Sequence, residues 1–494
     1  MKQLLLKFKS RVHRSPASFW PYLKRKRILF TGILIMFILI GSAWLSLANL
    51  NDTGFLTYHQ NVEVLPYTDG LHIFINDQVL DHVIPAEKCQ KISASIDGTV
   101  AAFLTDRKEL YLVQERILKK IADNVLHFEL SSSGKGLAFA QKYSEQSSLT
   151  LYDLEDEIQR EITTFVTRLD FSLSPDGKSL AYYTQTNDQE VLMCYRKEQS
   201  TEISTDHADL IGLSDDAKSI YAVCPSKSGA SVLYSFNHAG KATELGSVTS
   251  MSFKFNDNHR EIMFYDDGKT LISTNGRPAV VASSYPLYLV TSPNSQGTSD
   301  GNAITLPITT FFDHIYTCSD GGSTSAWLIR KDPEDSEKLV SRVSGCTLDE
   351  SAKYLYFIQD QSLLCVMNIS KGLSKIDTLA KNVDTYAITS NRSKAYYIDN
   401  GTLYCTNGKK AGDPLLIATN ISSFNLVMSA SDTLYYLTDH NVYGCKNGRT
   451  IDCILENIRS IYNSSNNVVY IIGENEIYTA YNKKQPIKVL FKDN

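Results

Sequence analysis

The chain has 494 residues, of which 43% are hydrophobic, 10% aromatic and 21% charged, and its net charge is −5. This composition is that of a globular protein and excludes an intrinsically disordered chain. Nine Lys and Arg residues precede Ile28, which leaves 40 basic against 54 acidic residues in the rest of the chain. A net charge of −14 there argues against a nucleic-acid-binding surface.

The N-terminal region has the pattern of a membrane anchor. Residues 1–27 form a basic tail without any acid, and Ile28–Ala48 follows with no charged residue and no His. As a helix this range spans roughly 30 Å, the thickness of a bilayer core, so it predicts a transmembrane helix. The positive-inside rule then predicts a single-pass cell-membrane protein with a cytoplasmic tail and an extracytoplasmic C-terminal domain. A cleaved signal peptide ending at Ser46-Leu47-Ala48 is the alternative.

Residues 49–62 are expected to be a linker to a repetitive region. The sharpest repeat is Leu173-Ser174-Pro175-Asp176-Gly177-Lys178-Ser179-Leu180-Ala181-Tyr182-Tyr183, in which a Pro-Asp-Gly turn precedes a short apolar strand. Looser copies share this rhythm, and the strands that we take as the first of each unit start near residues 71, 100, 136, 179, 219, 261, 314, 354, 394, 433 and 468. These eleven units are mostly 35 to 43 residues apart, the length of a four-stranded propeller blade.

The repeats predict an all-β fold of stacked modules. A small sheet cannot bury both of its faces alone, so the units are expected to pack side by side as a β-propeller. The spacing of 53 residues between the units at 261 and 314 is the one break, and it contains a Ser/Pro/Gly-rich loop or linker at 291–307. We therefore predict two tandem propellers, 63–290 and 308–494. One large ring with an inserted loop is the alternative.

The repeat at residues 173–183 resembles the TolB-type, WD-like β-propeller repeat of bacterial envelope proteins. One unit matches that repeat well, and the others match its turn and strand rhythm with the counterparts of Pro175 and Gly177 replaced. As a pattern the resemblance covers residues 63–491. It implies a propeller used for protein interaction, without indicating a particular partner.

No residue is predicted to be catalytic, cofactor-binding or metal-binding. The chain has no G-x-S-x-G elbow, so a dipeptidyl-peptidase-like hydrolase domain is excluded. Asp320-Gly321-Gly322-Ser323-Thr324 fits the core of a sialidase Asp box, but such a box stabilises a turn, and we interpret it as a blade turn. Asp266-Asp267-Gly268 offers oxygen ligands for calcium, yet Asp-Gly is ordinary turn chemistry, and a turn is the prediction.

Cysteines and tyrosines recur at fixed repeat positions. The chain has nine cysteines, and Cys365, Cys405 and Cys445 lie forty residues apart, so we expect them to be small core residues rather than disulfide partners. The same argument predicts core packing, not a binding surface, for the tyrosine pairs at 182–183, 396–397 and 435–436.

The sequence therefore predicts a membrane-anchored extracytoplasmic propeller that binds or scaffolds a protein, peptide or envelope glycan. Its predicted partners are the membrane, through Ile28–Ala48, and an unknown protein or glycan, with no nucleic acid and no cofactor. The alternative is a propeller-fold glycosidase or lyase whose carboxylates converge at the central channel. A sensor whose basic tail meets a cytoplasmic partner is a third hypothesis.

Overall fold

A computed structural model describes residues 62–491 except 68–69, 76–77, 144–145, 205–207, 227–228, 292–297, 301–302, 321, 372–374, 422–425, 430, 464–467, 474–475 and 481–486. The chain divides into two units, Met1–Thr53 and Gly54–Asn494, and every described residue lies in the second. The described residues form strands and only two single-turn 3-10 helices, η2 (Pro333–Asp335) and η3 (Ile369–Lys371).

The strands form eleven separate sheets, in which sequential strands pair antiparallel, and each sheet is one blade. Blade 1 comprises β1 (Val62–Tyr67), β2 (Gly70–Ile75) and β3 (Gln78–Ile84). Blade 2 comprises β4 (Cys89–Ala94), β5 (Val100–Thr105), β6 (Leu110–Gln114) and β7 (Ile117–Ala122). Blade 3 comprises β8 (Val125–Leu130), β9 (Gly136–Tyr143), β10 (Gln146–Asp153) and β11 (Ile158–Thr163). Blade 4 comprises β12 (Ser172–Leu173), β13 (Ser179–Thr186), β14 (Gln189–Arg196) and β15 (Gln199–Ser204).

The middle of the chain forms the next three blades. Blade 5 comprises β16 (Asp209–Leu213), β17 (Ile220–Pro225), β18 (Ser231–Phe236) and β19 (Ala242–Ser247). Blade 6 comprises β20 (Ser250–Phe255), β21 (Glu261–Asp266), β22 (Lys269–Thr274), β23 (Val280–Ser283), β25 (Thr298–Asp300) and β26 (Ala303–Thr305). Blade 7 comprises β24 (Tyr288–Leu289), β27 (His314–Asp320), β28 (Ser323–Ile329) and β29 (Glu337–Ser341).

Four further blades complete the set. Blade 8 comprises β30 (Val343–Leu348), β31 (Tyr354–Gln359), β32 (Leu363–Asn368) and β33 (Ile376–Ala380). Blade 9 comprises β34 (Thr385–Ile388), β35 (Lys394–Asp399), β36 (Thr402–Asn407) and β37 (Leu415–Ala418). Blade 10 comprises β38 (Val427–Met428), β39 (Thr433–Thr438), β40 (Asn441–Lys446) and β41 (Arg449–Leu455). Blade 11 comprises β42 (Ile458–Asn463), β43 (Val469–Gly473), β44 (Glu476–Ala480) and β45 (Ile487–Phe491).

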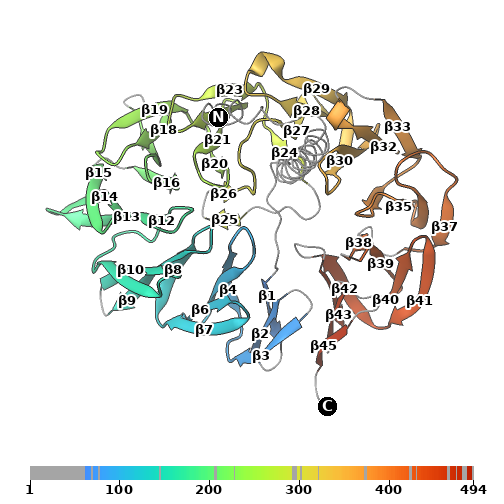
Figure 1. Ribbon diagram of the computed structural model, residues 1–494, viewed down its shortest axis with the longest axis horizontal. Coiled ribbons are helices and arrows are strands. Elements are labelled where there is room, and N and C mark those ends of the chain that lie inside the picture. The colour runs from blue at the N-terminus through green and yellow to red at the C-terminus, as the bar shows by residue number, and fades with distance from the viewer. Residues whose placement is uncertain are drawn as a thin grey trace, which may run out of the picture. The chain divides into compact units, whose positions relative to one another are not determined.

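The blades of this unit are arranged around one central axis, with the first strand of the blade on the inner side and, in blade 6, β26 and β25 further inward than β20 (Figure 1). A buried apolar cluster joins each blade to the next along the whole series. An eleventh cluster joins blade 11 to blade 1, where Phe74 packs with Val468, Tyr470 and Ile477. The rings of Phe74 and Tyr470 meet edge to face, with centroids 5.7 Å apart. The eleven blades therefore form one closed ring.

The recurring turn of the sequence joins the first strand of a blade to the second. In blade 4, Ser174 Oγ donates to Asp176 Oδ1 at 2.6 Å and accepts from the backbone N–H of Ser179 at 2.9 Å. Ser214 makes the equivalent pair of bonds in blade 5. These turn side chains therefore satisfy backbone groups that the strand ladder leaves free. The strands that we took as first in each unit are in fact the second strands, because the innermost strand precedes the turn.

The inserted segment between blades 6 and 7 is the largest departure from the predicted organisation. Within 291–307 the described residues include the hairpin β25–β26, and β26 pairs parallel with β20, the inner strand of blade 6. Parallel pairing of β26 with β20 extends one blade inward to six strands. The prediction of two tandem propellers separated by a linker is therefore wrong, and the alternative of one ring with an insertion describes the fold.

The predicted fold class also included a transmembrane helix, and this part is corrected. No helix among the described residues is long and apolar enough to cross a membrane. The range Ile28–Ala48, to which we assigned the helix, lies outside the described residues, as do the tail at 1–27 and nearly all of the linker at 49–62. The extracytoplasmic location and the membrane partner stay predictions of the sequence.

The core positions of the recurring residues are confirmed. The six tyrosines of the three pairs are each at most 4% exposed. Cys365, Cys405 and Cys445 are also buried, each in the third strand of its blade, and all nine cysteines are free thiols. Burial raises the pKa of Cys445 to about 11, which keeps this thiol neutral, as expected for a small core residue.

A buried histidine in blade 7 gives the fold a pH dependence. His314 is 6% exposed, and burial lowers its pKa from 6.5 to about 4, against smaller opposing effects of Asp313 and Thr310. Between these two values the unfolded chain binds more protons than the folded one. We therefore expect the free energy of unfolding to fall by about 3 kcal/mol more in the native protein than in His314→Gln as the pH drops from 6.5 to 4. Urea unfolding at several pH values measures this difference, and parallel pH profiles would contradict it.

Candidate functional site

The inner strands of blades 2 to 6 enclose a cavity of about 520 Å³, which we call the blade 2–6 cavity. Its wall is mixed in character. Polar and charged side chains lie beside apolar ones, and the residues that matter here are His127, Glu129, Arg168, Asp170, Leu169, Phe171, Asp209, Met251, His259 and Thr305.

Arg168 is the central cation of this cavity. It precedes β12 in blade 4, and its Nε and Nη2 donate to the two carboxylate oxygens of Asp170 at 3.0 and 2.5 Å. Nη2 also donates to Asp209 of blade 5 at 3.0 Å. The guanidinium carbon lies 4.2 Å from the ring centroid of Tyr183. A bidentate carboxylate together with an aromatic platform holds the guanidinium in one orientation at the cavity wall.

Tyr183 is itself fixed by blade 5. Its hydroxyl donates to the carbonyl of Ala208 and accepts from the N–H of Leu210, each at 2.6 Å. Burial raises the pKa of Tyr183, so the hydroxyl stays protonated and keeps both bonds. The platform under Arg168 is therefore rigid, and blade 5 as well as blade 4 determines where the cation lies.

The carboxylate of Glu129 has a structural partner. Glu129 lies on β8 and is 9% exposed, and its Oε2 accepts from the backbone N–H of Leu173 on β12 at 2.6 Å. Nearby, the rings of His127 and Phe171 meet edge to face at 5.1 Å. Both contacts join blade 3 to blade 4, so these side chains stiffen the wall of the cavity.

The inserted hairpin supplies a further part of the site. His259 stacks on Phe255 with ring centroids 4.3 Å apart, and its Nδ1 lies 3.1 Å from the carbonyl oxygen of Leu213. Because that oxygen can only accept, Nδ1 carries a proton, and in the neutral ring Nε2 accepts from the hydroxyl of Thr305 at 2.7 Å. Thr305 belongs to β26. The segment that the sequence marks as a loop or linker thus helps to build the cavity.

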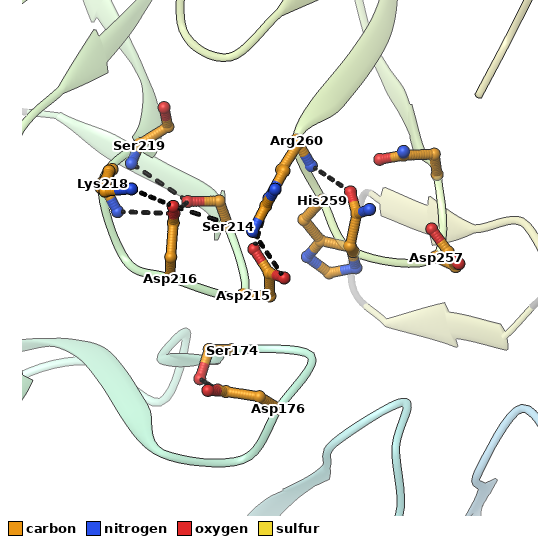
Figure 2. A network of polar contacts seen from close by, with 12 residues as sticks. Ser174, Asp176, Ser214, Asp215, Asp216, Lys218, Ser219, Asp257, His259 and Arg260 are labelled. Atoms are coloured by element: carbon orange, nitrogen blue, oxygen red, sulfur yellow. Dashed lines mark hydrogen bonds and ion pairs between the residues drawn. The ribbon is translucent and has the colours of Figure 1, made fainter. Parts of the chain in front are cut away.

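The turns between first and second strands form a polar network near this cavity. In Figure 2, Arg260 reaches from the turn of blade 6 to Asp215 in the turn of blade 5, with Nε 2.8 Å from Oδ1. Burial alone would raise the pKa of Asp216, but hydrogen bonds from Lys218 and Ser214 lower it to about 2. Asp216 is therefore ionised under ordinary conditions, and it accepts hydrogen bonds from Ser214 and Lys218 of its own turn.

Asp257 differs from the other turn acids. Burial raises its pKa, and its Oδ1 is buried without a hydrogen-bond partner among the described residues. Even so, the described residues contain no group of three His, Cys, Asp or Glu side chains that could hold a metal ion.

The sequence contains two motifs for which we considered a chemical role, an Asp box and a calcium site, and both lie in hairpin turns. Asp320 pairs with Ser323 at the turn between β27 and β28, as a blade turn requires. Asp267 and Gly268 have φ values of 45° and 75° in the turn between β21 and β22, and the Asp267 N–H donates to Thr249. Neither motif contributes to the blade 2–6 cavity.

Sequence reasoning did not identify the residues of this cavity. Arg168, Glu129, Asp209 and His259 come from four different blades, and no spacing along the chain marks them as a group. They lie on the first strands or next to them, which the repeat pattern did not reveal. The arrangement presents a fixed cation and exposed apolar side chains, and each of its acids already has a bond within the protein.

Comparison with known proteins gives a likeness of fold alone. No family model and no curated protein matches the chain. Among solved structures, a eukaryotic initiation factor is 11% identical with a TM-score of 0.39, covering 73% of this chain and 97% of its own. TolB from Acinetobacter baumannii is 15% identical with a TM-score of 0.29, covering 57% and 81%. A TolB protein from Agrobacterium tumefaciens is 15% identical with a TM-score of 0.29, covering 46% and 93%.

Proposed function

We propose that this propeller is a non-enzymatic binding module and that a peptide segment of a protein partner binds in the blade 2–6 cavity. The observation that carries the proposal is the combination of a fixed, partly exposed guanidinium with exposed apolar side chains in one cavity. The side chain of Arg168 is 31% exposed, and Leu169 and Met251 are 40% and 39% exposed.

The state of the carboxylates favours binding over glycoside cleavage. A glycosidase needs two acids that face the substrate and are available for proton transfer or attack. Here Asp170 and Asp209 are both bonded to Arg168, and Glu129 is buried against a backbone N–H. The three acids are therefore already bonded within the protein, which weakens the alternative of a glycosidase or lyase.

The apolar residues favour a peptide over a glycan. Leu169 and Met251 present flexible aliphatic surface, which suits apolar side chains of a partner. Arg168 adds a donor for a carboxylate or a backbone carbonyl of the same partner. Phe171, the aromatic ring that a sugar would stack on, is 2% exposed and packs against His127.

A site-specific photo-crosslink tests the proposal. We expect p-benzoylphenylalanine in place of Leu169 to crosslink a defined partner in cells of the source organism, and Met251→Asp in the same chain to reduce the yield several-fold. The matched control places the photoreactive residue at Ile117, which is 67% exposed on β7, the outermost strand of blade 2. Equal crosslinking at the two positions, or turnover of a substrate in a broad hydrolase panel, would overturn the proposal.

A further inference from the structure

A second cavity of about 520 Å³ lies on a different arc of the ring, between the inner strands of blades 8, 9 and 10. We call it the blade 8–10 cavity. Strands β30, β34 and β38 form its wall, and it shares no residue with the blade 2–6 cavity. Any ligand that it takes can therefore be studied separately from the partner proposed above.

One wall of this cavity is apolar and rigid. All four residues of β34 are half-buried rather than buried, and they include Ala387 and Ile388. Leu426, just before β38, is half-buried too. The Tyr386 hydroxyl donates to the carbonyl oxygen of Gly345 on β30, which fixes the aromatic ring across the gap between two blades. Half-buried aliphatic side chains in a preformed cavity offer favourable contact to an apolar group of a ligand.

The charge on the cavity wall has one sign. Four acids line it, and no Lys, Arg or His does; the acids are Asp349, Glu350, Asp384 and Asp432. Asp349 accepts hydrogen bonds from backbone N–H groups of its own turn, and Asp432 accepts one from the N–H of Ser390 in the turn of the neighbouring blade. The exposed carboxylate of Asp384 accepts from the N–H of Asn400 at 2.9 Å, and it forms no ion pair with a described residue. Burial raises the pKa of Cys346 to about 12, so this thiol adds no charge.

The two cavities differ in their electrostatics. In the blade 2–6 cavity Arg168 offsets part of the charge of the three lining acids, whereas no Lys, Arg or His lines the blade 8–10 cavity. Charge complementarity across an interface selects a partner of opposite sign, and an adjacent apolar wall selects one that also carries aliphatic groups.

We propose that the blade 8–10 cavity binds a basic, apolar peptide segment. A Lys or Arg of the peptide pairs with the carboxylate of Asp384, and a neighbouring aliphatic side chain packs against Ile388 and Leu426. This site is additional to the blade 2–6 cavity, and the two occupants need not belong to the same partner.

Fluorescence anisotropy with a defined probe tests this site in the full chain. The probe is a fluorescein-labelled hexapeptide, Leu-Lys-Leu-Leu-Lys-Gly, and the matched probe replaces both Lys with Glu. We expect the basic peptide alone to bind, with affinity that falls as ionic strength rises from about 0.05 to about 0.5 M. Asp384→Asn keeps an oxygen for Asn400 but removes the charge, and we expect it to weaken binding about two- to fivefold.

Two further variants separate this site from general charge effects and from misfolding. Ala387→Trp fills the cavity and should weaken the basic peptide by at least about tenfold. Asp377→Asn, on the outermost strand β33 of blade 8, removes the same charge outside the cavity and should leave binding unchanged. Equal binding of the two peptides, no binding of either, or insensitivity to both Asp384→Asn and Ala387→Trp in variants with native melting temperatures would overturn the proposal.

Discussion

Replacing Phe74 by Ala should lower the free energy of unfolding by about 3–5 kcal/mol, because it removes the ring that closes the propeller. Phe74 is fully buried, and apart from partly buried neighbours its cluster contains only Val468, Tyr470 and Ile477 of blade 11. No covalent bond joins blade 1 to blade 11, so this packing is what couples the first and last blades. Chemical denaturation of the purified protein measures the loss.

Phe139→Ala is the control for this prediction. Phe139 is 1% exposed in the cluster between blades 2 and 3, away from the closure. If the ring is closed as described, the two substitutions cost similar amounts of free energy. We also expect Phe74→Ala, but not Phe139→Ala, to expose blades 1 and 11 to limited proteolysis first, since only the former frees an end of the series. A loss below about 1 kcal/mol for Phe74→Ala alone would contradict ring closure.

The second large effect is expected at Gly177, the glycine of the Pro-Asp-Gly turn. Gly177 has a φ of +76°, and a Cβ there would lie 2.5 Å from the backbone nitrogen of Gly136 in the neighbouring blade. Because the contact is with backbone, no side chain can rotate to relieve it. We expect Gly177→Ala to lower the free energy of unfolding by about 3 kcal/mol or more, through backbone strain and overpacking together. Thermal and urea unfolding measure it.

Two other glycines separate these two causes. Gly268 has nearly the same φ, +75°, but a Cβ there would meet nothing within 4 Å, so Gly268→Ala should cost only about 1 kcal/mol. Gly136 has no positive φ, yet its Cβ would lie 2.5 Å from the carbonyl oxygen of Gly177, so Gly136→Ala should report the clash alone. If Gly177→Ala cost no more free energy than Gly268→Ala, the close contact between Gly177 and Gly136 would be contradicted.

The residues of the blade 2–6 cavity are also positioned by contacts between neighbouring blades. Arg168 is positioned by Asp170 of its own blade and by Asp209 of the next. His259 is positioned by Leu213 of blade 5 and by Thr305 of the insert. Such residues can be predicted only once the neighbours of each blade are known, because residues far apart in the chain meet only after the blades have packed.

The sequence by itself determined the number of blades and the place of each second strand, since local turn chemistry and short apolar runs are properties of neighbouring residues. All eleven predicted strand starts lie within one residue of an observed second strand. It also identified the recurring tyrosines and cysteines as core, because a side chain repeated at one blade position meets the same environment each time. Tertiary structure alone decided that the ring is single, since Phe74 and Tyr470 are separated by nearly the whole propeller. Tertiary structure also decided that 291–307 adds strands to blade 6. The pairing of β26 with β20 joins segments that are distant in the chain, and no local sequence pattern indicates it.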